Sequence, residues 1–141
     1  MQTTDDLKAS VQAEIDRRGE ELVRVAKKVL DNPEPGFREQ KTSRIVAEKF
    51  RDLGITYQEN IAITGLKGVL DGGSPGPTVA VMGELDSLKV LGHPHADPDT
   101  DAAHACGHHC QIGMMLGVAA GLQAAGVMES LAGRVALIAV P

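Results

Sequence analysis

The chain has 141 residues, a hydrophobic fraction of 43% and a formal net charge of −5, which is enough apolar sequence for one folded domain. It contains no dense run of lysine and arginine, which argues against nucleic acid as a partner. The longest mostly apolar stretch, Ile112 to Val127, is shorter than the roughly 20 residues that span a bilayer. The N-terminus also lacks the basic and apolar regions of a signal peptide. These features predict a cytoplasmic protein without a membrane segment, and its two cysteines are too few for a disulfide framework.

The N-terminal third is predicted to be helical. Thr3 or Thr4 can cap a helix whose first turn carries acids, and apolar residues then recur at helical spacing as far as Leu30. The prolines of Asn32–Gly36 end this helix. A second helix is predicted from about Glu39 to Leu53, because apolar residues form a stripe along it and a glycine follows it.

Four strands are predicted in the remainder of the chain, at Ile55–Gln58, Lys67–Leu70, Thr78–Met82 and Arg134–Val140. The second and third are expected to form a hairpin across the glycine- and proline-rich segment between them. The third and fourth are apolar without alternation. This predicts neighbouring or near-neighbouring interior strands that are covered on both faces.

A polar loop, Ser87 to His104, and a helix from about His109 to Ala125 are expected between the last two strands. Gly113, Gly117 and Gly121 recur along this helix at four-residue spacing, and we expect that small-residue face to pack closely against the sheet. The order of elements predicts an α/β fold, with a layered sheet flanked by helices.

Residue types that bind metals concentrate after one of these strands and before the third helix. Glu84 and Asp86 follow an apolar strand, at the carboxyl end where α/β sheets place ligands, although acids in solvated loops are common. The segment His104–Cys110 holds three histidines and both cysteines of the chain. Thiolate and imidazole are good ligands for zinc and similar divalent ions. Cys106 and His108 would share one side of an extended segment, which predicts them as metal ligands.

Other interpretations of the histidines and cysteines stay open. The cysteines could be small buried residues and the histidines loop residues, or a cysteine and a histidine could form a nucleophile and its base. A plain metal-binding or redox-active Cys/His protein is a further alternative. His93 and His95 lie in a loop rich in proline and aspartate and are interpreted as solvated residues, with a place on an active-site rim as the alternative.

The order of these motifs resembles that of the metallo-aminoacylase and carboxypeptidase-like amidohydrolases. It is most similar to the branch that holds N-acyl-amino-acid, auxin-conjugate and aminobenzoyl-glutamate hydrolases. The resemblance is carried by G-E-L-D-S-L, H-A-C-G-H, the apolar glycine-containing helix and R-V-A-L-I-A-V-P, together with the turn Pro33–Phe37. It implies that residues 1–141 form the N-terminal part of a zinc-peptidase-like catalytic domain, without the lid domain.

For the site, the resemblance implies that Cys106 and His108 bind a divalent metal ion (Zn, Mn, Co or Ni), as part of a two-metal site in the full-length parent. Asp86 matches a residue that orients a metal ligand. Glu84 stands where the family has an aspartate. The family commonly continues H-A-C-G-H with Asp-x-His, whereas this chain has His-Cys-Gln, ending at Gln111.

The function implied for the parent is hydrolysis of the amide bond of N-acyl-amino acids or small peptide-like conjugates. The partners are then small-molecule substrates, and a homo-oligomer is possible. In the family a Glu-Glu pair, which provides the general base and a ligand, follows the strand matching Val135–Pro141, and this chain stops before that pair. We therefore expect the 141-residue chain to be inactive alone. The alternative is a non-catalytic metal-binding or interaction fragment.

Overall fold

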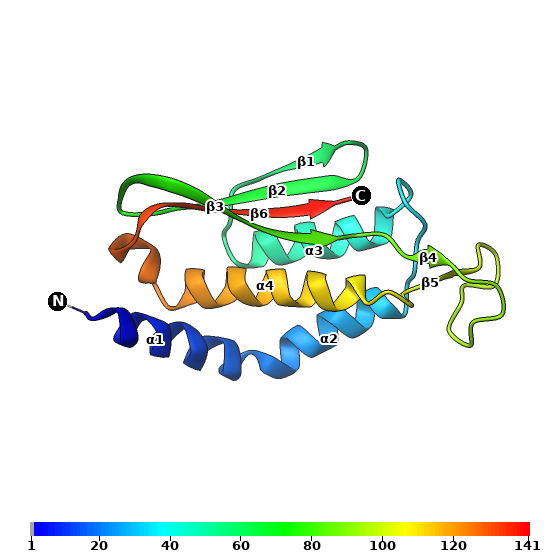
Figure 1. The fold of residues 1–141 in the computed structure, drawn as a ribbon, viewed down its shortest axis with the longest axis horizontal. Coiled ribbons are helices and arrows are strands. Elements are labelled where there is room, and N and C mark those ends of the chain that lie inside the picture. The colour runs from blue at the N-terminus through cyan, green and yellow to red at the C-terminus, as the bar shows by residue number, and fades with distance from the viewer. Residues whose placement is uncertain (1) are drawn as a thin grey trace.

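The computed structural model describes residues 2–141 and places a mixed sheet above two layers of helices (Figure 1). The helices are α1 (Thr4–Arg17), α2 (Gly19–Leu30), α3 (Gln40–Asp52), α4 (His108–Ala124) and the 3₁₀ helix η1 (Val127–Ser130). The strands are β1 (Tyr57–Ile61), β2 (Gly65–Asp71), β3 (Ser74–Glu84), β4 (Leu88–Lys89), β5 (Ala102–Ala103) and β6 (Ala132–Val140). In Figure 1, α3 and α4 lie beneath the sheet, and α1 and α2 lie beneath α4. Within residues 2–141 no helix is long and apolar enough to cross a membrane.

The main sheet has the strand order β1-β2-β6-β3, in which β6 runs antiparallel to β2 and parallel to β3. The predicted α/β class is confirmed, but the predicted hairpin between β2 and β3 is wrong, because β6 lies between them. The segment that links β2 to β3 passes close to the start of β6, where the Gly72 N–H donates to the Gly133 carbonyl at 2.7 Å. A Cβ at Gly72 would lie 2.5 Å from that same oxygen. Glycine is therefore required here for the close approach of two backbones, rather than for a tight hairpin.

The two apolar strands are neighbours, as predicted, because β3 pairs with β6 in parallel. Their predicted interior position is confirmed for β6 and wrong for β3. β6 lies between β2 and β3, and Leu137 on β6 is fully buried. β3 forms an edge of the sheet within the described residues, so Val79 and Met82 remain 59% and 58% exposed. The apolar residues of β3 are therefore not buried on both faces, although their sequence predicted that they would be.

The single N-terminal helix that was predicted is divided into α1 and α2. Its start is as expected, because the Thr3 side chain accepts the Asp6 N–H and the Asp6 carboxylate accepts the Thr3 N–H, as in a capping box. The division falls at Arg18, whose backbone (φ −96°, ψ 3°) leaves helical geometry. Gly19 follows it, and glycine is a poor helix former.

The glycine face of α4 packs against the other helices, not against the sheet as predicted. Cβ atoms placed on its three glycines would lie 2.7–3.5 Å from side-chain atoms of α1 and α2. These contacts pair Gly113 with Ala26, Gly117 with Leu22, and Gly121 with Ile15. The other buried apolar residues of α4 are Ile112, Met115, Leu116, Ala119 and Ala120. α4 is thus enclosed between the sheet and the α1–α2 layer, which fixes the position of its first residue, His108.

The predicted polar loop between Ser87 and His104 contains the short pair β4 and β5. His93 and His95 lie between these two strands. His95 is exposed and His93 is half-buried, and the His95 N–H donates to His93 Nδ1 at 3.1 Å.

Candidate metal centre

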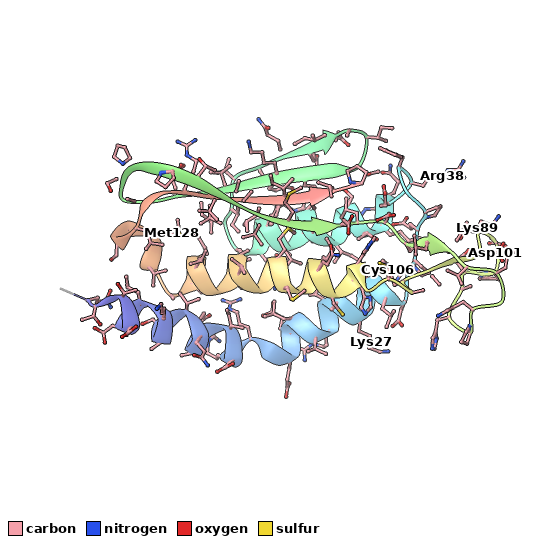
Figure 2. All side chains as sticks on the ribbon, viewed as in Figure 1. Lys27, Arg38, Lys89, Asp101, Cys106 and Met128 are labelled. Atoms are coloured by element: carbon pink, nitrogen blue, oxygen red, sulfur yellow. The ribbon has the colours of Figure 1, made fainter. Side chains whose placement is uncertain are left out.

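The two chemically rich segments meet at one end of the molecule. β3 ends at Glu84 and α4 begins at His108, and these two elements pack against each other. Figure 2 shows Cys106 at the start of α4, at the opposite end of that helix from Met128. The backbone at Gly107 has φ 93°, a left-handed conformation that glycine adopts without strain. Cys106 therefore lies in a turn before the helix, rather than on the extended segment that was expected.

His108 is held between two carboxylates. Its Nδ1 lies 2.8 Å from Asp86 Oδ1 and 3.0 Å from the Asp86 carbonyl oxygen. Its Nε2 lies 3.0 Å from Glu84 Oε2. The His108 side chain is only 10% exposed, whereas those of Asp86 and Glu84 are 24% and 47% exposed. The contact with Asp86 is of the kind that fixes the ring orientation and tautomer of a metal-binding histidine.

Glu84 is in turn held by the first part of α4. The Glu84 N–H donates to Gln111 Oε1 at 3.1 Å, and Gln111 Nε2 donates to Glu84 Oε2 at 3.1 Å. Neither contact was predicted from the sequence. Two hydrogen bonds from one amide side chain therefore join the end of β3 to α4 beside His108.

The cysteines are both free and exposed, so the interpretation of them as small buried residues is wrong. Cys110 Sγ lies 3.3 Å from His109 Nε2. His109 Nδ1 is buried and has no hydrogen-bond partner among the described residues. A nucleophile pair needs a third group that orients the base, so this geometry does not support one at Cys110.

His104 and His109 form a pair of adjacent imidazole rings in the same segment as His108. Burial and the nearby His109 and His108 lower the pKa of His104 to about 4. Burial, with a smaller contribution from His108, also lowers the pKa of His109. The two rings lie edge to face with centroids 5.5 Å apart. Both side chains are therefore neutral near pH 7.

The Pro-Glu-Pro-Gly-Phe turn fixes the loop that carries Asp86. The Glu34 carboxylate accepts two backbone N–H groups at 2.9 Å in the first turn of α3. The Glu34 carbonyl accepts the Ser87 N–H at 2.9 Å and its hydroxyl at 2.8 Å. A Cβ at Gly36 would lie 4.0 Å from Asp86 Cβ, so the turn lies directly beside the site.

The donor types fit part of a site for a divalent transition metal. A thiol, an imidazole oriented by a carboxylate and a second carboxylate are all ligand types that zinc accepts. Among residues 2–141, however, no group of three or more histidine, cysteine, aspartate or glutamate side chains is arranged to hold an ion. The donor types at this end of the α/β fold therefore suit a divalent metal ion, but the described residues do not by themselves assemble a site for one.

No family model matches the chain, but part of the chain is similar to curated proteins. The chain is 34% identical over 100 residues to thermostable carboxypeptidase 2 of Saccharolobus solfataricus, covering 68% of this chain and 25% of that protein. It is 34% identical over 101 residues to IAA-amino acid hydrolase ILR1-like 2 of Arabidopsis thaliana, covering 70% and 23%. It is 31% identical over 97 residues to hippurate hydrolase of Campylobacter jejuni, covering 67% and 25%.

Solved structures give the same result for the fold. A protein described as an aminohydrolase, from methicillin-resistant Staphylococcus aureus, matches 92% of this chain with 34% of its own, at a TM-score of 0.77 and 26% identity. A Bacillus subtilis protein described as a dinuclear metal binding peptidase of the M20 family matches 90% of this chain with 35% of its own, at a TM-score of 0.73 and 24% identity. These findings confirm the resemblance to the metallo-aminoacylase and carboxypeptidase-like amidohydrolases, in that the chain is similar to one segment of a carboxypeptidase and of hydrolases of amino-acid conjugates. It spans about a quarter of the length of the curated relatives it matches.

Proposed function

We propose that this chain is part of a metal-dependent amidohydrolase that cleaves the amide bond of N-acyl-amino acids or small peptide-like conjugates. In this proposal Cys106 and His108 are ligands to a divalent ion (Zn, Mn, Co or Ni) that belongs to a two-metal site of the whole enzyme. The observation that carries the proposal is the 2.8 Å contact between His108 Nδ1 and Asp86. The names of the relatives, a carboxypeptidase and hydrolases of amino-acid conjugates, support the substrate class.

Each residue has a separate task in this proposal. Asp86 accepts the Nδ1–H of His108, so that the lone pair for the metal is on Nε2. Ser87 ties the Asp86 loop to the Pro-Glu-Pro-Gly-Phe turn and limits its movement. Cys106 is exposed and precedes a glycine, so its thiol is free to turn toward the ion. Both cysteines of the chain are unpaired, which suits a reducing cytoplasm.

A bound divalent ion would polarise the amide carbonyl and make water a better nucleophile. Catalytic sites of this type keep about three protein ligands and an open position, and they also need a positioned general base that contributes about 10²–10⁴-fold. The chain offers two proposed ligands, and the carboxylates beside them already contact His108. We therefore propose that the 141-residue chain is inactive alone and that the remaining length of the parent supplies the missing groups.

The test combines metal content with activity. The 141-residue chain, given zinc, manganese, cobalt or nickel, should not hydrolyse N-acetyl-, N-benzoyl- or aminobenzoyl-glutamate substrates. A protein that contains this segment at the relatives' full length should hydrolyse at least one of these classes. In that protein Cys106→Ala and His108→Ala should each lower the metal content by about tenfold or more.

Three results would contradict the proposal. Unchanged metal content in both variants would remove the ligand assignment. Metal binding without turnover at full length would favour the alternative of a non-catalytic metal-binding fragment. Metal-dependent turnover by the 141-residue chain that disappears with Cys106→Ala would show that the chain carries its own base.

A further inference from the structure

Glu39 is a fully buried glutamate that the proposed function does not use. Its side chain is 0% exposed, and its carboxylate joins two segments that are distant in the sequence. Oε1 accepts the Phe37 N–H at 2.7 Å, and Oε2 accepts the Thr64 hydroxyl at 2.5 Å. Thr64 is also buried and stands directly before β2. Glu39 therefore ties the Pro-Glu-Pro-Gly-Phe turn to the main sheet.

Both segments that Glu39 joins carry strained backbone. Among the described residues, five that are not glycine have a positive φ, and four of these lie in the two segments: Phe37 at 60°, Asn60 at 62°, Ala62 at 47° and Ile63 at 85°. A branched side chain such as that of Ile63 rarely adopts this conformation. Strain of this kind persists only where surrounding contacts hold it, and it gathers at functional sites. The two hydrogen bonds to Glu39 are contacts that can hold it.

The turn that Glu39 holds lies against the loop that carries Asp86. A Cβ at Gly36 would lie 3.9 Å from Glu39 Oε1 and 4.0 Å from Asp86 Cβ, so the two acidic residues flank the same glycine. Near the start of the turn, the Glu34 carbonyl accepts both the N–H and the hydroxyl of Ser87. The turn is therefore fixed to the Asp86 loop at one end and, through Glu39, to the sheet at the other.

We infer that Glu39 is a positioning residue, which holds this turn and thereby sets the place of Asp86 and the orientation of the His108 ring. Asp86 Oδ1 lies 2.8 Å from His108 Nδ1, and the strength of such a hydrogen bond depends steeply on its geometry. The inference rests on the proposed function only for the use of His108 as a metal ligand, because the contacts themselves involve no ion. The competing possibility is that Glu39 stabilises the fold and has no effect on the ring.

The experiment observes the His108 ring directly, in the metal-free 141-residue chain. The ring nitrogens of histidine are isotope-labelled, and NMR detects the proton on Nδ1 and its rate of exchange with water. The His108 signal is the one that is missing from His108→Gln.

Three variants change the contacts of Glu39. Glu39→Ala removes both hydrogen bonds, Thr64→Val removes one of them, and Glu39→Gln keeps the size of the side chain. Thr100→Val is the matched control, because it removes a hydroxyl-to-carboxylate bond of 2.9 Å in the exposed loop. Thermal melts followed by far-UV circular dichroism check that each variant is folded.

Glu39→Ala should abolish the protected Nδ1 proton signal, since Asp86 is then free to move. Thr64→Val should keep the signal but speed its exchange with water, because one of the two bonds remains. Glu39→Gln should behave like the native chain, since its carbonyl can accept the Phe37 N–H and its amide can donate to the Thr64 oxygen. Thr100→Val should have no effect.

A folded Glu39→Ala chain with an unchanged signal would overturn the inference. If that chain does not fold, an unchanged exchange rate in Thr64→Val would overturn it instead. Loss of the signal in Glu39→Gln, or its absence from the native chain, would also overturn it. The proposed function fails by a different measurement, the metal content of Cys106→Ala and His108→Ala, so the two failures are distinguishable.

Discussion

Replacing Gly121 with alanine tests how α4, which carries His108, is seated on α1. A Cβ there would lie 2.7 Å from Ile15 Cγ1 and 3.0 Å from Val11 Cγ1, well inside the 3.5–4.0 Å of ordinary carbon contacts. Gly117 is a matched control in the same helix, because its Cβ would meet the nearest atom, on Leu22, at 3.5 Å. Both substitutions gain about 0.8–1.0 kcal/mol of helix propensity, so the difference between them isolates the steric conflict.

Overpacking of this kind costs about 1–3 kcal/mol. Gly117→Ala should therefore raise the free energy of unfolding by up to about 1 kcal/mol. The free energy of unfolding of Gly121→Ala should be about 1–3 kcal/mol lower than that of Gly117→Ala. Urea unfolding followed by circular dichroism measures both values. No residue of α1 is fully buried, and the close contact at Gly121 is one of those that hold α1 against α4. Equal stabilisation by the two substitutions would refute the packing of α1 against α4.

Two further predictions concern charged side chains. Asp86→Asn should weaken metal binding by about 10- to 100-fold, because an amide can donate to Nδ1 and so favour the wrong tautomer. Asp99→Asn, in the exposed loop, is the control, and equal affinities in a Co²⁺ titration would argue against the orienting role. Hydrogen bonds from two neighbouring arginines lower the pKa of Glu14 from 4.5 to about 2. The stability that this carboxylate contributes is present above pH 4.5 and is lost as the pH falls toward 2, so Glu14→Gln should flatten the pH dependence of thermal melts in that window at low salt. An unchanged pH dependence would show that the arginine contacts do not persist in solution.

The elements set by local sequence were predicted best. Helical periodicity located α3 and α4, and Thr3 marked the start of α1. The predicted neighbouring position of β3 and β6 is confirmed by their parallel pairing, but the predicted hairpin of β2 and β3 was wrong, because strand pairing is decided by contacts distant in sequence. The apolar run in β3 indicated an interior strand, but it could not show that β6 would separate β3 from β2.

The candidate site was partly visible in the sequence. The clustering of histidine and cysteine drew attention to Cys106 and His108, and the family resemblance added Asp86, which contacts His108. Gln111 was noted only as a departure from the pattern, and its contact with Glu84 arises where α4 packs beside β3. The one local signal for Gln111 was its spacing. It lies three residues after His108 in the helix, so the two side chains share one side of α4.

The central claim is that Cys106 belongs to a metal site, and one measurement tests it most directly. The 141-residue chain is titrated with Co²⁺, and the absorption band that reports a thiolate bound to cobalt is followed in the native chain, in Cys106→Ser and in Cys110→Ser. Both cysteines are exposed and only four residues apart, so each variant controls for the other. The account predicts a band that survives in Cys110→Ser and is lost in Cys106→Ser. A band that survives in Cys106→Ser, or one that depends on Cys110, would contradict it.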